Sequence, residues 1–295
     1  LGLPYSKDEL EKIEDDILKR LEEFKTKELP EDAFVLYIDA YHGKLKESSG
    51  KVRKCCIYTV LGIDLEGNRE VYGFYIVMGS ENKDEWIKIF NDLISRGLKR
   101  ILLIVSDDFS GLDGAIEAIF PKTDHQLCFV HLQRNVKRNM SKEDSKEFNR
   151  KLRETYIYYS NNFEEAKDKL DNILEEYKNR YPSFISYLLK KEGKYLSFMK
   201  YPQRVRRSIY TTNIIENFNS LLERIRHRLG GYFASKQILG INVMLQCEKL
   251  EKTKWKKPHP IIRGELYEIN QIFNLRFYEN NMNLKTVKNS QTQCS

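Results

Sequence analysis

Apolar residues recur with a two-residue period in the first third of the chain, which is typical of β-strands. Three such runs, rich in β-branched and aromatic residues, lie close together, and Glu66-Gly67-Asn68 separates the last two. The runs are "FVLYIDAYHGKL" (34–45), "KCCIYTVLGID" (54–64) and "REVYGFYIVMG" (69–79). Because short turns join only antiparallel strands, these runs predict an antiparallel meander.

Strand and helix patterns alternate in the next part of the chain. A helix is predicted from Asn82, an N-cap with Glu85 three residues later, to a stop at Gly97. A buried strand (101–106), a helix (112–120), a second strand (123–132) and a helix starting near His131 follow. This alternation implies parallel strands with crossover helices. The predicted fold class is α/β: a ribonuclease H-like mixed five-stranded sheet, with three antiparallel and two parallel strands, and an α-helical insertion.

Helical periodicity marks the remaining regions, at residues 6–27, through most of 141–196, and at 214–229 and 236–250. The patterns divide the chain into five segments. They are a connecting helix (1–30), the first part of the core (31–140), a helical insertion (141–200), the core completion (201–250) and a C-terminal segment (251–295) whose polar end we expect to be loose.

Composition narrows the class of protein only modestly. The 50 basic and 43 acidic residues give a net charge of +7, which suits a polyanion such as DNA without requiring one. No apolar run approaches the length of about 18 residues that spans a membrane. The N-terminus lacks both a signal-peptide pattern and a starting Met, which indicates a processed or truncated piece. Five unevenly spaced cysteines fit reduced thiols in a cytosolic protein.

Two aspartates stand where the predicted sheet would bring them together. Asp39 lies near the end of the first strand and Asp107 directly after the fourth, its neighbour in this fold. Convergent carboxylates suit Mg²⁺, and two such ions about 4 Å apart can promote phosphodiester attack. The alternatives are an exposed strand position for Asp39 and turn formation by Asp107 or Asp108, which spacing alone does not separate.

A third carboxylate ligand would have to come from a helix. In the helix 214–229, Glu216 lies opposite the apolar stripe, on the same face as Glu223. Asn213 as N-cap with Glu216 at the N3 position would instead form a capping box. Glu223 is nearly as good a candidate, so local spacing leaves the third ligand open.

Five stretches together resemble the catalytic region of the Mutator-related transposases of insertion sequences. They are "YIDAYHGK", "LGIDLEGNREVYGF", "RGLKRILLIVSDDFSGLDGAIEAIFP", "HQLCFVHLQRN" and "IYTTNIIENFNSLLERIRHR". They occur in the family's order and cover roughly residues 30 to 250. The resemblance implies a ribonuclease H-like domain with an Asp-Asp-Glu metal site, interrupted by a helical insertion before the glutamate.

Matched residue by residue, the resemblance assigns the catalytic and metal-binding roles to Asp39, Asp107 and Glu216. Asp108 stands where the family usually has glycine, which places a bulkier, charged residue beside the site. The family's Cys-x-x-His motif is Cys128 and His131 here. It suggests a supporting role near the active site or the DNA rather than a metal site. The alternative is a buried thiol ending strand five and a histidine opening the next helix.

The implied activity is metal-dependent hydrolysis of phosphodiester bonds at transposon ends, followed by transfer of the 3′-hydroxyl into target DNA. Mg²⁺ would be the cofactor, with Mn²⁺ as a substitute, and DNA the partner of a homodimer or higher assembly at the nucleoid in a prokaryotic cytoplasm. The family's upstream helix-turn-helix region is not expected in the roughly thirty residues before the first strand. Two rival functions remain: a nuclease that does not join DNA, and a domesticated or inactive DNA-binding derivative.

Basic residues cluster after the predicted insertion and are candidates for phosphate contacts, which give affinity with little sequence information. The candidates are Arg204, Arg206, Arg207, Arg224, Arg226 and Arg228, with four lysines (252, 254, 256, 257) around Trp255. The alternative is a set of solvated charged faces. Tyr210 and Trp255 could stack on unpaired bases or pack against the protein.

Overall fold

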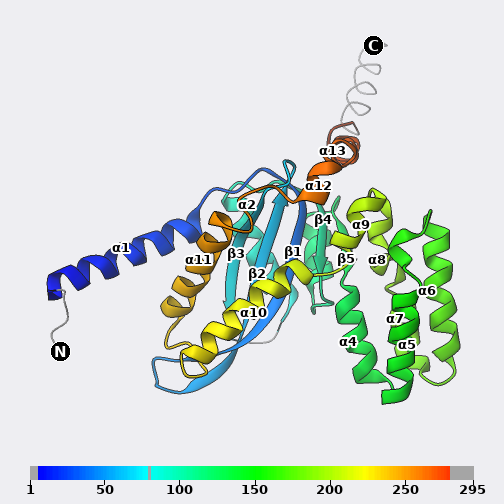
Figure 1. Ribbon diagram of the computed structural model, residues 1–295, viewed down its shortest axis with the longest axis horizontal. Coiled ribbons are helices and arrows are strands. Elements are labelled where there is room, and N and C mark those ends of the chain that lie inside the picture. Colours follow the sequence, from blue (N-terminus) through cyan, green and yellow to red (C-terminus); the bar gives the residue numbers. More distant parts are fainter. Residues whose placement is uncertain (1–5, 79–80, 280–295) are drawn as a thin grey trace, which may run out of the picture.

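The computed structural model describes residues 6–78 and 81–279. It contains a five-stranded sheet of order β3-β2-β1-β4-β5 (Figure 1). The strands are β1 (Asp32–Lys46), β2 (Val52–Asp64), β3 (Arg69–Val77), β4 (Arg100–Ser106) and β5 (Asp124–Leu127). β2 pairs antiparallel with β1 and β3, whereas β4 pairs parallel with β1 and β5. The predicted mixed sheet is confirmed, although β5 is shorter than expected because a helix begins at Phe129.

β1 and β4 separate just before Asp39 and Asp107. Their parallel pairing runs from Asp32 opposite Arg100 to Ile38 opposite Ser106. Beyond it, β1 remains paired with β2 as far as Lys46, and an isolated bridge joins Leu45 to Phe233. Asp39 is therefore in the middle of β1, not near its end as predicted, but it is the first residue past the pairing with β4. Asp107 is the first residue after β4, so the fork between the two strands brings both aspartates to one place.

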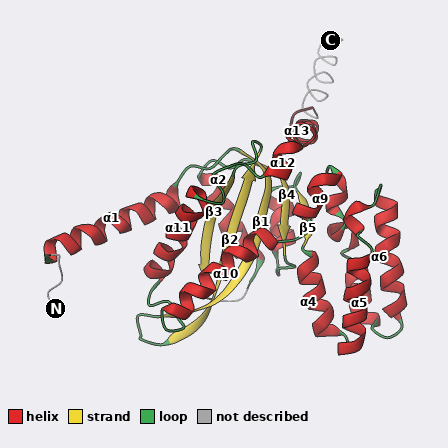
Figure 2. Cartoon of the chain, viewed as in Figure 1, coloured by secondary structure: helices red, strands yellow, loops and turns green. Residues whose placement is uncertain are grey.

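Helices account for most of the rest of the described chain (Figure 2). In order they are α1 (Lys7–Thr26), α2 (Lys83–Ser95), α3 (Leu112–Ile119), α4 (Phe129–Asn139), α5 (Lys142–Glu154), η1 (Ile157–Tyr159), α6 (Phe163–Lys178), α7 (Pro182–Leu189), α8 (Glu192–Tyr195), η2 (Ser197–Lys200), α9 (Gln203–Ile209), α10 (Asn213–Arg228), α11 (Lys236–Lys252), α12 (Pro260–Gly264), α13 (Leu266–Asn274) and η3 (Leu275–Glu279). The sequence patterns did not predict α12 and α13, which bury Ile262, Ile269 and Phe273. The polar tail that we expected to be loose lies outside the described residues.

Helices cover both faces of the sheet. On β1, Leu36 and Ile38 belong to an apolar cluster with α2 and α3. Tyr41, on the alternate face, packs in a cluster with α10 and α11, and Figure 1 shows α10 crossing the front of the sheet. Because side chains alternate along a strand, Asp39 shares the face of Tyr41. It is only 5% exposed, so the alternative of an exposed strand position is wrong.

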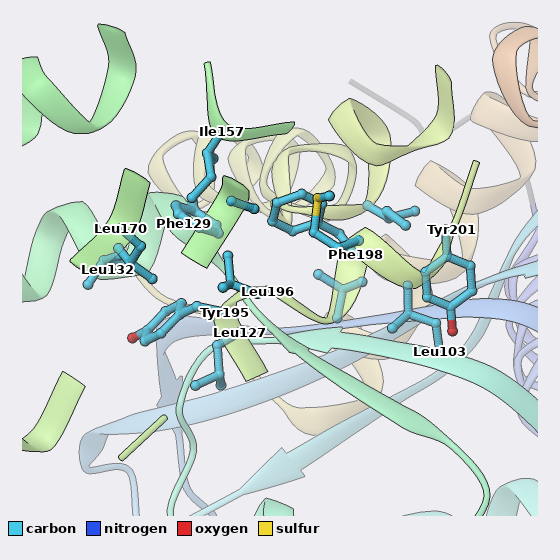
Figure 3. Close-up of a cluster of buried hydrophobic side chains, with 14 of the residues drawn as sticks. Leu103, Leu127, Phe129, Leu132, Ile157, Leu170, Tyr195, Leu196, Phe198 and Tyr201 are labelled. Carbon is cyan, nitrogen blue, oxygen red and sulfur yellow. The ribbon is translucent and has the colours of Figure 1, made fainter. Parts of the chain in front are cut away.

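The helices α5 to α9, which we call the helical block, share a core with the β4–β5 side of the sheet (Figure 3). Leu103 and Leu127 from the strands belong to the same buried cluster as Phe129 on α4 and Leu170 on α6. None of the helices in the described ranges is both long and apolar enough to cross a membrane. The four cysteines among these residues are free thiols.

Candidate active site

A pocket of about 480 Å³ opens at the fork between β1 and β4. We call it the carboxylate pocket, and its lining includes Asp39, Asp107, His131, Arg134, Glu216 and Asn219. The three acids come from β1, from the segment after β4 and from α10. Residues far apart in the chain therefore line one pocket.

Asp39 is the most deeply placed of the three acids. Burial raises the pKa of its carboxyl group, since desolvation disfavours the charged form. The charge of His131 and hydrogen bonds from the Ala40 backbone and Asn219 act against this shift, whereas the Glu216 carboxylate adds to it. The Asn219 bond runs from Nδ2 to Asp39 Oδ2 at 2.8 Å. A desolvated carboxylate next to a second carboxylate favours a cation at this position.

His131 lies between the two aspartates. Its Nε2 atom is 4.0 Å from Asp39 Oδ1 and 3.8 Å from Asp107 Oδ2. The same nitrogen lies 2.7 Å from Nη1 of Arg134, one turn further along α4. Because both carboxylates approach the same ring nitrogen, they flank a common space. His131 therefore lies near the acids, as expected.

Glu216 lies in the first turn of α10, but it does not cap the helix. The N-cap is Thr212, with no side-chain cap bond, so Asn213 is the first helical residue and not the cap. Glu216 is then one position past N3, and the capping-box alternative is wrong. Its Oε1 atom lies 2.8 Å from Arg134 Nη1, an ion pair without hydrogen-bond geometry.

Cys128 explains why Thr212 does not cap α10. The backbone N–H and the hydroxyl of Thr212 both donate to the Cys128 sulfur, at 3.3 and 3.2 Å. Burial raises the pKa of this thiol. Cys128 occupies the N-cap position of α4 without a side-chain capping bond, and its sulfur binds Thr212, so it joins the beginnings of the two helices that carry His131 and Glu216.

Asp107 and Asp108 point to different partners. The Asp107 carboxylate lines the carboxylate pocket and accepts the backbone N–H of Asp108 at 2.7 Å. The Asp108 carboxylate accepts hydrogen bonds from the Tyr187 hydroxyl and the Lys191 ammonium group, both in or next to α7. The residue that replaces the family's glycine therefore ties the segment after β4 to the helical block.

Glu223, the other glutamate considered for the third position, is already paired. It accepts hydrogen bonds from the Arg226 guanidinium and the Tyr41 hydroxyl, which lower its pKa to about 2. Nε2 of His227 is 2.9 Å away. These partners leave Glu216 as the less satisfied glutamate on α10.

The six candidate DNA-binding arginines differ in what they contact. Arg206 is buried and donates to the carbonyls of Tyr201 and Ser160, at 2.9 and 2.7 Å, which makes it a structural residue. Arg226 is committed to Glu223. Arg204 forms an exposed ion pair with Glu265. The other three, Arg207, Arg224 and Arg228, are exposed and form no ion pair within the described ranges.

Several pocket residues were not singled out from the sequence, among them Arg134, Arg138 and Asn219. His131, Arg134 and Arg138 are spaced i, i+3, i+7 on α4, which places them on one helix face. That spacing was the available signal. Nothing local marked Asn219, because its role depends on the packing of α10 against β1.

The donor set of the carboxylate pocket fits a hard divalent cation, which prefers oxygen ligands. As the side chains lie, however, no three His, Cys, Asp or Glu residues of the described chain form a ready-made metal cluster. The Glu216 carboxylate is paired instead with the Arg134 guanidinium. The pocket thus contains carboxylates of the kind that bind such an ion, with Glu216 held by Arg134.

Comparisons with known proteins identify the family. The model of the transposase family called Mutator matches residues 1–257. Relatives include a probable insertion-sequence transposase of Corynebacterium diphtheriae (29% identity), the IS1201 transposase of Lactobacillus helveticus (28%) and the ISRM3 transposase of Rhizobium meliloti strain 1021 (32%). The matches cover 79%, 76% and 79% of this chain, which spans 67%, 59% and 57% of the relatives' lengths. The chain belongs to the Mutator family of transposases.

Proposed function

We propose that the chain is the ribonuclease H-like catalytic region of an Asp-Asp-Glu transposase. It would hydrolyse phosphodiester bonds at transposon ends and transfer the 3′-hydroxyl into target DNA. The observation that carries the proposal is that Asp39, Asp107 and Glu216 line one pocket. The strand order, with the pocket at the carboxyl end of parallel β4, supports the fold assignment.

Asp39, Asp107 and Glu216 would hold Mg²⁺, or Mn²⁺ in its place. Bound ions supply the positive charge that activates a nucleophile and stabilises the leaving oxygen. The chain prepares the pocket by desolvating Asp39 and by orienting its carboxylate through Asn219. Glu216 becomes a ligand when Arg134 releases it, which frees the guanidinium for a DNA phosphate.

The DNA path that we propose runs from this pocket over exposed basic residues. Arg134 and Arg138 line the pocket, and Arg207, Arg224 and Arg228 supply exposed charge without internal ion pairs in the described ranges. Phosphate contacts of this kind give salt-dependent affinity. A homodimer would bring two transposon ends together, in a prokaryotic cytoplasm at the nucleoid.

Asp39→Asn tests the proposal, because it removes the charge and keeps a carbonyl acceptor for Asn219. We expect cleavage of labelled element-end DNA with Mn²⁺ to fall at least about 1,000-fold, as on loss of a catalytic group. Mn²⁺ affinity, measured by calorimetry without DNA, should fall as well. Asp168→Asn, at an exposed acid of α6, is the matched control and should change neither quantity.

The same experiment separates the rival functions. Cleavage without strand transfer by the wild-type chain would indicate a nuclease. DNA binding with neither Mn²⁺ affinity nor cleavage would indicate an inactive derivative. Wild-type levels of cleavage and Mn²⁺ binding in Asp39→Asn would disprove the proposed site.

A further inference from the structure

A second pocket, of about 580 Å³, lies between α4 and the region of α7. Asn135 and Asn139 of α4 form one side, and Tyr181, Phe184 and Tyr187 form much of the other. Its lining residues are all uncharged. The chemistry of this pocket, which combines aromatic faces with side-chain amides, differs from that of the carboxylate pocket.

Ring contacts and hydrogen bonds to neighbouring residues hold the aromatic wall in place. The rings of Phe184 and Tyr187 are nearly parallel, with planes 17° apart and centroids 6.2 Å apart. The Tyr187 hydroxyl donates to Asp108, and the Lys191 ammonium lies 4.7 Å from the centre of the Tyr187 ring. The Tyr181 hydroxyl donates to Asp144 at 2.7 Å. Rings fixed in this way lose little freedom when a flat ligand stacks on them.

The amide wall can offer hydrogen bonds. Asn139 uses its Nδ2 group for the Asn135 carbonyl, which leaves its side-chain oxygen as an acceptor. The side-chain amide of Asn135 forms no hydrogen bond within the described ranges and offers both a donor and an acceptor. Paired donors and acceptors of this kind recognise the edges of nucleobases.

The second pocket adjoins the carboxylate pocket along α4. Arg134 and Arg138 line the carboxylate pocket, and Asn135 and Asn139 each follow one of them by one residue. One residue is a rotation of about 100° around a helix, so the two pairs lie on adjacent faces. On the other side, Tyr187 contacts Asp108, next to Asp107. A strand with a phosphate at the arginines can therefore present its base to the amides and rings.

We propose that this second pocket, the base pocket, binds one unstacked nucleobase of the DNA beside the phosphate held in the carboxylate pocket. The inference rests on the proposed function. Stacking on the aromatic rings provides the affinity, because every base has an aromatic face. Hydrogen bonds with the side-chain amides of Asn135 and Asn139 fix the orientation of the base within its own plane. The neighbouring arginines favour a nucleotide over an aromatic side chain from a protein.

Fluorescent DNA tests the base pocket. The probe is a duplex with a single-stranded overhang, in which 2-aminopurine replaces each overhang base in turn, titrated in EDTA so that metal binding plays no part. We expect one position to change its emission on binding to the wild-type chain. Phe184→Ala should abolish that change and weaken binding roughly 5- to 100-fold, the range for one lost base stack.

Two further measurements make the test specific. An abasic nucleotide at the responding position should weaken wild-type binding by at least the same factor, and should weaken binding of Phe184→Ala by less. Phe184→Tyr keeps a ring and should restore binding. Phe163→Ala, which removes an exposed ring from α6 outside this pocket, is the matched control and should bind like the wild type.

The outcomes separate this inference from the proposed function. Equal DNA binding by Phe184→Ala, Phe163→Ala and wild type would overturn the base pocket and leave the Asp39 experiment unaffected. A change in the mass of the DNA-free protein in Phe184→Ala would show that the pocket holds a second copy of the chain, and would overturn it too. Absence of DNA binding by every protein would overturn both proposals.

Discussion

The acids inside the carboxylate pocket differ from those around it in their partners. Asp108 is bonded to Tyr187 and Lys191, and Asp113 lies 2.5 Å from both His125 Nδ1 and Lys194 Nζ. Inside the pocket, Asp39 has an amide, Asp107 a backbone N–H, and Glu216 a single exposed arginine. The surrounding acids fix the structure, because their charges are compensated. The pocket acids line one space and have fewer charged partners, with Arg134 on Glu216 as the cation that pairs with one of them.

The largest expected effect contrasts Asp107 with Asp108. Asp107→Asn should lower cleavage at least about 1,000-fold, as loss of a catalytic group does. Asp108→Asn should lower it only about 10-fold, and should lower the free energy of unfolding by about 1–3 kcal/mol because Tyr187 and Lys191 lose a charged acceptor. Single-turnover cleavage and urea unfolding measure the two effects. The opposite ranking in cleavage would shift our assignment by one residue.

A smaller effect is expected from Arg134, the internal cation. Arg134→Gln removes the charge that competes for Glu216, so Mn²⁺ affinity without DNA should rise up to about 5-fold, the value of an exposed ion pair. Arg138→Gln is the matched control, since it removes the same charge from the same pocket without breaking a carboxylate ion pair. Calorimetry with Mn²⁺ compares them. Equal affinities in the two variants would show that Arg134 does not restrain Glu216.

The smallest effect concerns Glu223, a pocket residue whose negative charge is balanced by Arg226. Its partners lower its pKa from 4.5 to about 2, so its ionised form stabilises the fold above pH 4.5 and that contribution is lost as the pH falls towards 2. Glu223→Gln should lower the free energy of unfolding at pH 7 by no more than about 1 kcal/mol, because the pair is partly exposed. The difference from wild type should vanish near pH 2. Urea unfolding across this pH range tests it, and a constant difference would contradict the assigned charge pairing.

Patterns along the chain predicted the sheet well, because its strands are long, apolar and separated by recognisable turns. Periodicity also located α2 with its cap at Asn82 and stop at Gly97, and the structure agrees with both. The length of β5 was overestimated, since the apolar stretch that begins at Leu127 continues into the first turn of α4 and was taken as strand. The helices α12 and α13 were missed because they are short, with five and nine residues.

The composition of the site was partly predictable, whereas its pairings were not. Residues alone suggested Asp39 and Asp107, and only the family resemblance chose Glu216 over Glu223. The contacts that now separate the glutamates, Arg134 with one and Tyr41 with the other, join segments far apart in the sequence. The same holds for Arg206, whose burial against three carbonyls no local pattern reveals.

The register of β1 and β2 has a consequence for engineering this chain. Asp39 faces α10 only because Ile38 and Ala40, on either side of it, face α2 and α3. A slip of one residue would exchange the two faces, burying the carboxylate among hydrophobic side chains and exposing isoleucine to the pocket. The β1–β2 pairing that places these hydrophobic side chains in the core thus also directs the Asp39 carboxylate towards α10. Repacking the inside of this hairpin would therefore redirect Asp39 even when no pocket residue is substituted.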